Sequence, residues 1–405
     1  MNLPRPTTTR TFLRDQEKPA SVTNIELFFD LVFVFMVTQL SKHLLENLTI
    51  EGALQTALLL GLVWLTWVYT TWVTNWLDPD LVATRMMLLA VMLGSLVMAS
   101  RLPVAFAAGG LVVGVSYAAI HVGRALYVVV VLEHDTFLRR NFERILAWCC
   151  VSGALAVAGG VADGHAREVL WLGVVLVDLL GGAVGFYTPV LGRSHASEWS
   201  IDGGHFAERC QLFVIIALGE SIVVLGETLS GLHHANEIAV FVTAMIGAAL
   251  LWWVYFDRSA EDAADVIANS ASPGRLGRSA YHFVHPILIG GIIVSAAGDD
   301  ELLLAAHTDP GRHVELSTVL LVTGGTALFL AGHACFKAVV WRRPPWSRLT
   351  AVVALLLLMS VGAHLAPLPL GLLTALIVLA VCIYDRVHPA AAVAVTAADS
   401  RGGAG

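Results

Sequence analysis

Twelve long apolar runs fill most of this 405-residue chain. A helix needs about 20 mostly apolar residues to cross the hydrocarbon core of a bilayer, and the runs are close to this length or longer. Only 14% of the residues are charged, whereas soluble domains carry roughly 25%. The sequence therefore predicts an all-α polytopic membrane protein, with helices near residues 24–45, 52–76, 83–100, 104–131, 144–162, 168–190, 207–230, 236–256, 279–297, 315–339, 348–365 and 368–385.

Lysine and arginine residues are divided unequally between the two sets of loops. With the N-terminus placed inside, 19 of the 24 lie on the inner side, and four lie on the outer side. Cytoplasmic loops carry this excess in membrane proteins, so we expect both termini in the cytoplasm. The first residues are polar and no cleavable signal is evident, which makes the first helix an uncleaved anchor.

The two halves of the chain resemble one six-helix unit repeated in parallel orientation. "YAAIHVGRA" aligns with "FLAGHACFKA", which pairs His121 with His333 and places the cations Arg124 and Lys337 three or four residues later. "WLTWVY" similarly aligns with "LLWWVY". The expected organisation is a cytoplasmic tail at 1–23, a first half at 24–190, a cytoplasmic linker at 191–206, a second half at 207–386 and a disordered tail at 387–405.

The stretch "IELFFDLVFVF", residues 25–35, carries two acids in an otherwise apolar run. Glu26 and Asp30 are four residues apart and therefore share one helix face. Buried acids need a partner or a proton, and Arg124 lies at a depth that permits a pair with Asp30. Static pairing, a role in an ion or substrate pathway, and an interface-facing position all stay open for these acids.

A second polar cluster begins with "HFAERCQLFVIIALGESIVVLGETL", residues 205–229. Glu208 and Arg209 stand at the cytoplasmic mouth of this helix, and Glu220 follows twelve residues, or about 18 Å, further along. An acid in mid-membrane is a candidate functional residue, because it is stable only as a neutral acid or beside a counter-ion. The alternative is a protonated Glu220 that is hydrogen-bonded across helices.

Further candidates for an ion or substrate pathway carry weaker signals. Asp178 is an acid in the sixth run, and "YHFVHPILIGG" places His285 directly before a helix-kinking proline. A core histidine is an equally good interpretation of that stretch. His121, Arg124, His333 and Lys337 join this group through the repeat alignment.

Several classes of function lack support. The five cysteines have no metal-ligand spacing, and the net charge of -7 argues against nucleic acid as a partner. The sequence contains no phosphate-binding glycine loop, no G-x-S-x-G and no H-E-x-x-H motif. We therefore expect no cofactor, no metal and no catalytic residue, with the lipid bilayer and a small ion or solute as partners; the oligomeric state is not indicated.

The two long motifs together identify a family resemblance. "ELFFDLVFVFMVTQLSKHL" and "ERCQLFVIIALGESIVVLGETL" are similar to the motifs of the bacterial low temperature requirement protein A family. The resemblance covers nearly the whole chain and implies a bacterial inner-membrane location. It matches Glu26, Phe29 and Asp30 to the first motif and Glu208, Arg209, Gly219, Glu220 and Ser221 to the second. The family name refers to growth in the cold and implies no settled activity.

Three classes of function fit these observations. Transport of an ion or small solute through a carrier or channel, with proton coupling, is favoured, since two parallel halves, intramembrane acids and no nucleotide motif suit a secondary transporter. A membrane-embedded enzyme acting on a lipid or envelope precursor is the alternative, with Glu26, Asp30, Glu208 and Arg209 near the cytoplasmic interface. A sensor or scaffold without turnover is the third.

The charge distribution gives a testable topology. Reporter domains fused after Gly192 and after His388 should both report a cytoplasmic location, because the inner loops hold the excess of lysine and arginine. Activity of a periplasmic reporter at either point would contradict this orientation.

Overall fold

The computed structural model describes residues 12–14, 21–132, 136–194, 202–229, 234–257, 259–270 and 273–388. Most of the expected N-terminal tail, residues 195–201 of the expected linker and the expected tail after His388 lie outside these ranges.

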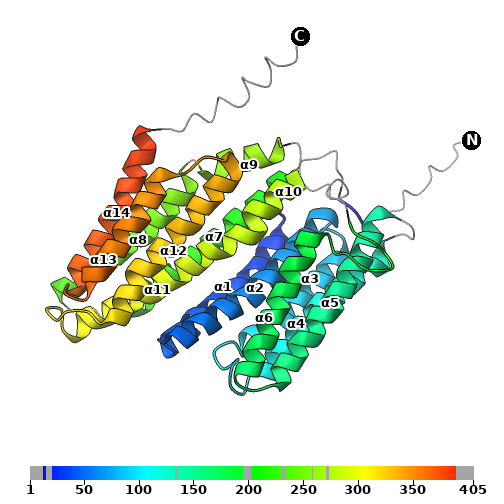
Figure 1. Ribbon diagram of the computed structural model, residues 1–405, viewed down its shortest axis with the longest axis horizontal. Helices are drawn as coiled ribbons and strands as arrows, with labels where there is room; N and C mark the ends of the chain where they lie inside the picture. Colours follow the sequence, from blue (N-terminus) through cyan, green and yellow to red (C-terminus); the bar gives the residue numbers. More distant parts are fainter. Residues whose placement is uncertain are drawn as a thin grey trace, which may run out of the picture. The chain divides into compact units, whose positions relative to one another are not determined.

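Every apolar run predicted to span the membrane coincides with a helix (Figure 1). No strand occurs in the described part of the chain, which contains only two isolated bridges. The all-α prediction is thus confirmed. The helices are α1 (Asn24–Glu46), α2 (Ile50–Trp76), α3 (Val82–Ala99), α4 (Gly110–Val131), α5 (Phe137–Val161), α6 (His165–Val184), α7 (Gly203–Leu229), α8 (Ala235–Phe256), α9 (Ser259–Ala268), α10 (Pro273–Gly277), η2 (Arg278–Val284), α11 (His285–Thr308), α12 (Leu316–Trp341), α13 (Trp346–Gly362) and α14 (Pro367–Val387).

Nine helices of the described residues are long and apolar enough to cross a membrane. Three of the predicted spans fall short of that standard. Helices α6 and α11 each carry three charged side chains, and α13 is an apolar helix of only 17 residues. Charged groups in such helices need burial inside the protein or a position near the membrane surface.

The chain forms two compact units, and the limits of these units fall inside helices. The first comprises residues 1–36 and 61–209, and the second comprises residues 37–60 and 210–405. Helices α1, α2 and α7 therefore contribute residues to both. The predicted division into sequential halves and the parallel repeat stay predictions, because spatial clustering of the chain does not test its duplication.

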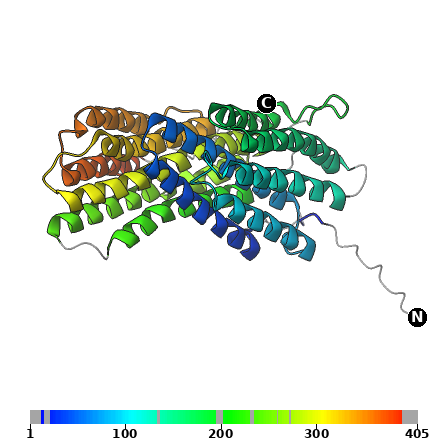
Figure 2. The same cartoon turned by 90° about the horizontal axis from the view of Figure 1, so that it is seen from below.

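In the first unit, α3 to α6 pack in sequence order, each against the next (Figure 2, cyan to green). Helices α4 and α5 touch through their backbones, since an added Cβ at Gly114 would lie 2.2 Å from the carbonyl oxygen of Ala156. The contact between Gly160 and Gly110 lies further along the same antiparallel seam. Small residues permit this close approach where van der Waals packing must hold helices together in lipid.

The second unit contains a similar seam between α11 and α12. A Cβ on Gly291 would lie 2.3 Å from the backbone nitrogen of Phe329, and one on Gly325 would lie 2.4 Å from that of Ser295. Gly298 and Gly332 repeat the pattern seven residues further along their helices. Helices α12, α13 and α14 then pack in order, and α14 contacts α8 (Figure 1).

The π-helical segment η2 runs directly into α11. Pro286, the second residue of α11, has no backbone N–H, and its ring crowds the carbonyl one turn earlier. A wider turn before the proline accommodates that loss. Single π turns occur often at functional sites.

The α11–α12 seam predicts that the same substitution is destabilising at one glycine and tolerated at its neighbour. Gly325→Ala should lower the free energy of unfolding by about 1–3 kcal/mol, because the new methyl group overpacks the backbone contact with Ser295. Gly324→Ala is the matched control, since its Cβ would meet only the flexible end of Met359 at 3.4 Å. Thermal unfolding in detergent measures both. A Gly325→Ala variant as stable as the control would contradict the seam.

Candidate functional site

Arg209 of α7 binds both carboxylates of the first motif, within the first unit. Its NH1 group donates to Oε1 of Glu26 at 3.0 Å, and its NH2 group donates to Oδ1 of Asp30 at 2.6 Å. Glu26 and Asp30 lie one turn apart on α1, so their carboxylates face the same way. All three side chains are buried, with exposed fractions of 3% or less.

Glu26 has further donors at the start of α1. Arg14 NH2 donates to its Oε2 at 2.8 Å, and the backbone N–H and hydroxyl of Thr23 donate to the same oxygen at 3.0 and 2.9 Å. His205 Nε2 lies 3.0 Å from Oε1. These contacts replace the water that the Glu26 carboxylate loses on burial.

Aromatic groups enclose the ion pairs. The guanidinium carbon of Arg209 lies 5.7 Å from the ring centroid of Phe29 and 5.8 Å from that of Trp67. The indole N–H of Trp67 also donates to Oδ1 of Asp30 at 2.8 Å. Cation–π contact strengthens where the cation is desolvated. The network therefore joins α1, α2 and α7 through charges that are all compensated.

The structure corrects the expected partner of Asp30. The predicted pair with Arg124 is not present, because Asp30 binds Arg209 and Arg124 belongs to another cluster. Arg124 donates to the Thr70 hydroxyl at 2.8 Å and to the carbonyl oxygen of Thr66 at 3.2 Å. Similar depth permitted the predicted pair, but depth does not specify which face of a helix a side chain occupies.

Asp178 forms the centre of that other cluster. Its Oδ2 accepts a hydrogen bond of 2.5 Å from the Tyr117 hydroxyl and lies 3.8 Å from Nδ1 of His121. The ring of His121 stacks on Tyr117 with a centroid distance of 4.0 Å. Asp178, His121 and Arg124 are all buried. Three predicted pathway residues thus lie together in the first unit, linking α4 and α6.

Glu220 has a different environment, in the second unit. Its Oε2 accepts a hydrogen bond of 2.6 Å from the Thr38 hydroxyl of α1. The side chain is 2% exposed, and no arginine, lysine or histidine of the described ranges lies at ion-pair distance from it. Glu208, by contrast, is exposed and accepts a bond of 3.4 Å from the backbone N–H of Val22.

A model of the bacterial low temperature requirement A protein family matches residues 21–383. The chain belongs to this family. An uncharacterized protein of Rhizobium meliloti (strain 1021) is 35% identical over 364 residues, which cover 89% of this chain and 88% of that protein. No solved structure matches the chain. Family membership and the apolar helices establish an integral, multi-pass membrane protein.

The motif residues of the low temperature requirement A resemblance thus separate into two settings. Glu26, Asp30 and Arg209 form the compensated network of the first unit. Glu220 belongs to the second unit, accepts a hydrogen bond from the Thr38 hydroxyl and has no cationic partner at ion-pair distance among the described residues. Cys210, which follows Arg209 in the second motif, is fully buried.

Each unit contains a tyrosine ring that lies beside a buried histidine. The ring of Tyr69 lies 5.5 Å from that of His121, and the ring of Tyr255 lies 6.0 Å from that of His333. The repeat alignment pairs these tyrosines and these histidines with each other. The contacts match the repeat alignment, and the duplication itself stays a prediction.

The polar partners of the two histidines differ. Nδ1 of His121 faces Arg124 NH2 at 3.4 Å, whereas neither ring nitrogen of His333 has a hydrogen bond within the described part of the chain. His285 instead bonds the Tyr255 hydroxyl through Nε2 at 2.8 Å. Lys337 lies with its ammonium group 5.4 Å from the ring of Trp341.

Sequence reasoning missed several partners of the motif acids. His205 contacts Glu26 and Trp67 contacts Asp30, but neither residue is among the candidates that the sequence predicts. Thr38 is not a predicted candidate either, because it lies in a largely apolar run. The one available signal was position, because His205 stands four residues, or one helical turn, before Arg209.

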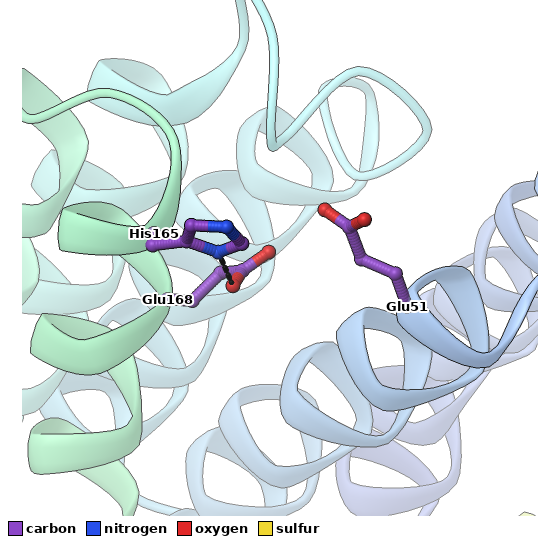
Figure 3. A group of neighbouring side chains, drawn as sticks. All are labelled: Glu51, His165 and Glu168. Atoms are coloured by element: carbon purple, nitrogen blue, oxygen red, sulfur yellow. Dashed lines mark hydrogen bonds and ion pairs between the residues drawn. The ribbon is translucent and has the colours of Figure 1, made fainter.

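Other acid–histidine pairs lie at the protein surface. Figure 3 shows His165 and Glu168 of α6, whose side chains are 2.9 Å apart across one turn. The His165 side chain is 87% exposed. Pairs of this kind contribute little to stability, so they differ in kind from the buried network.

The network predicts a large effect from a substitution that keeps the charge. Arg209→Lys should lower the free energy of unfolding by about 3–5 kcal/mol, because one ammonium group cannot span two buried carboxylates and leaves one of them unpaired. Arg85→Lys is the control, since Arg85 pairs with Asp80 in an exposed setting and should change stability by about 1 kcal/mol or less. Equal unfolding temperatures for the two variants would contradict the assignment.

Proposed function

We propose that this protein transports an ion or small solute across the membrane, as a carrier or channel, and that Glu220 carries a coupled proton. The observation that supports this most is the setting of Glu220. Its carboxyl group is buried in α7, a candidate membrane span, and its direct partner is the Thr38 hydroxyl. The sequence places it about 18 Å along the helix from Glu208.

The physical chemistry of that setting favours a change of charge. An acid inside a membrane is stable as a neutral group or beside a counter-ion. Glu26 and Asp30 have Arg209 as their counter-ion. Glu220 lacks one among the described residues, and it therefore depends on whatever small cation reaches it. Loading and unloading of such a group can couple two fluxes.

The remaining candidate residues receive different proposed roles. The Asp178, His121 and Arg124 cluster is held by hydrogen bonds from neighbouring helices, which supports a structural role. His285, His333 and Lys337 of the second unit stay proposed pathway residues. Burial of Glu26, Asp30 and Arg209 in mutual contacts gives the enzyme alternative little support, because an acid–base pair must reach its substrate.

The proposed location is the inner membrane of a bacterium, with both termini in the cytoplasm. The excess of lysine and arginine in the inner loops supports this orientation. The acidic pair of α1 then lies near the cytoplasmic end of its helix. Glu220 lies further from that side, where a proton from either compartment has to cross part of the bundle.

The proposal predicts separate effects of Glu220→Gln on fold and on flux. The amide is nearly isosteric and keeps a hydrogen bond with Thr38, so the unfolding temperature should not change. It cannot exchange a proton, so proton-linked flux should be abolished. Purified protein in liposomes with a trapped pH-sensitive dye measures the flux under an imposed pH gradient.

Glu51→Gln provides the matched control, because Glu51 is an exposed acid in the first turn of α2. It should leave both readouts at the wild-type level. Wild-type proton flux in the Glu220→Gln variant across the pH range would refute the role of Glu220.

A further inference from the structure

We propose that Glu220 is an exchange site at which a small monovalent cation of sodium-ion size competes with the proton, so that the protein is a cation/proton antiporter. This inference rests on the proposed function and names its substrate class. It starts from the oxygen atoms that surround the carboxyl group.

Two hydroxyl groups of α1 face Glu220. Thr38 donates to Oε2 at 2.6 Å. Ser41 lies three residues further along, on the same face of the helix, and is close enough to interact with the Glu220 carboxyl group. Its fully buried hydroxyl oxygen makes no direct hydrogen bond within the described ranges. A carboxylate and two hydroxyls are oxygen ligands of the kind that hard cations prefer.

Several threonine hydroxyls of the second unit bond the backbone of their own helix. Serine and threonine in helices commonly bond the carbonyl four residues earlier. Thr56, Thr243 and Thr374 all do so, with distances of 2.8, 2.7 and 2.9 Å. The Thr38 hydroxyl donates across helices to the carboxyl group of Glu220, and the Ser41 hydroxyl makes no direct hydrogen bond within the described part of the chain. Both hydroxyls lie close to one acid.

The charge of the site selects a monovalent ion and imposes exchange. Glu220 is neutral when it holds a proton, and the site is also neutral when a carboxylate holds one monovalent cation. The bare carboxylate is unfavourable in a buried site. A divalent ion would leave an uncompensated positive charge. The site is therefore stable only when one of the two cations occupies it, which couples the exit of one to the entry of the other.

The charged neighbours favour cations over anions. Glu227 lies on the same helix, about 10 Å further along, and acts electrostatically on both Glu220 and Asp300 of α11. Asp300 and Glu315 both act electrostatically on Glu301. Lys42 of α1 is the opposing positive charge and is exposed. A surface rich in acids raises the local concentration of cations and repels anions.

The test uses the full-length protein in liposomes with an acidic interior and a trapped pH-sensitive dye. External sodium or lithium chloride should make the interior more alkaline, whereas choline chloride should not. Binding of radioactive sodium to the purified protein should weaken as the pH falls, because protons compete for Glu220. Indifference of the proton flux to sodium, lithium and potassium would overturn the antiport proposal while leaving proton-linked transport intact.

Variants of the hydroxyls separate ion binding from proton binding. Ser41→Ala and Thr38→Val should each weaken the apparent sodium affinity about tenfold, since each removes one ligand of a charged group. Thr56→Val is the matched control and should keep the wild-type affinity. Unchanged sodium affinity in both α1 variants would overturn the site. The absence of any proton flux in the wild type, under an imposed pH gradient as well as with added cations, would overturn the proposed function as well.

Discussion

The two carboxylates of α1 are stable in an apolar environment because one guanidinium group of α7 binds both. Two lysines would have to be positioned separately to bind the two acids. The planar guanidinium group of Arg209 binds Glu26 and Asp30 together, because these acids are one helical turn apart. Trp67 and Phe29 then exclude water from the pairs. The start of α1, the start of α7 and the middle of α2 are fixed together in the first unit by this one arrangement. A slip of α1 or α7 would leave a buried charge unpaired, and a slip of α2 would remove the indole hydrogen bond to Asp30.

Helices α1 and α7 contribute different polar groups to the second unit. Beyond Met36 and Arg209, Thr38 and Ser41 of α1 bring hydroxyl oxygens toward Glu220 of α7, and no arginine of the described residues lies at ion-pair distance from that acid. One pair of helices thus contributes a neutralised cluster to one unit and an acid that needs a cation to the other. This contrast in charge compensation separates the residues that hold the fold from those for which we propose ion exchange.

Much of the fold followed from the sequence, because apolar runs of sufficient length have few alternatives to spanning helices. The special status of Glu26, Asp30, Arg209 and Glu220 also followed, since the cost of burying a charge is evident without coordinates. The partner of Asp30 did not. Depth along a helix is readable from spacing, but rotation about the helix axis is decided by packing, and this rotation places Arg124 beside Thr70. The contact of the Thr38 hydroxyl with Glu220 could not be predicted for the same reason.

The glycine seam between α11 and α12 has a mechanical consequence. Backbone atoms of the two helices meet at Gly291, Gly298, Gly325 and Gly332, and a slide of one residue, about 1.5 Å, would bring side chains against backbone at each point. The two helices are therefore expected to resist sliding past each other. Bending of this part of the second unit is expected instead at the π-helical segment η2 and Pro286, since kinks in helices occur at prolines and π turns.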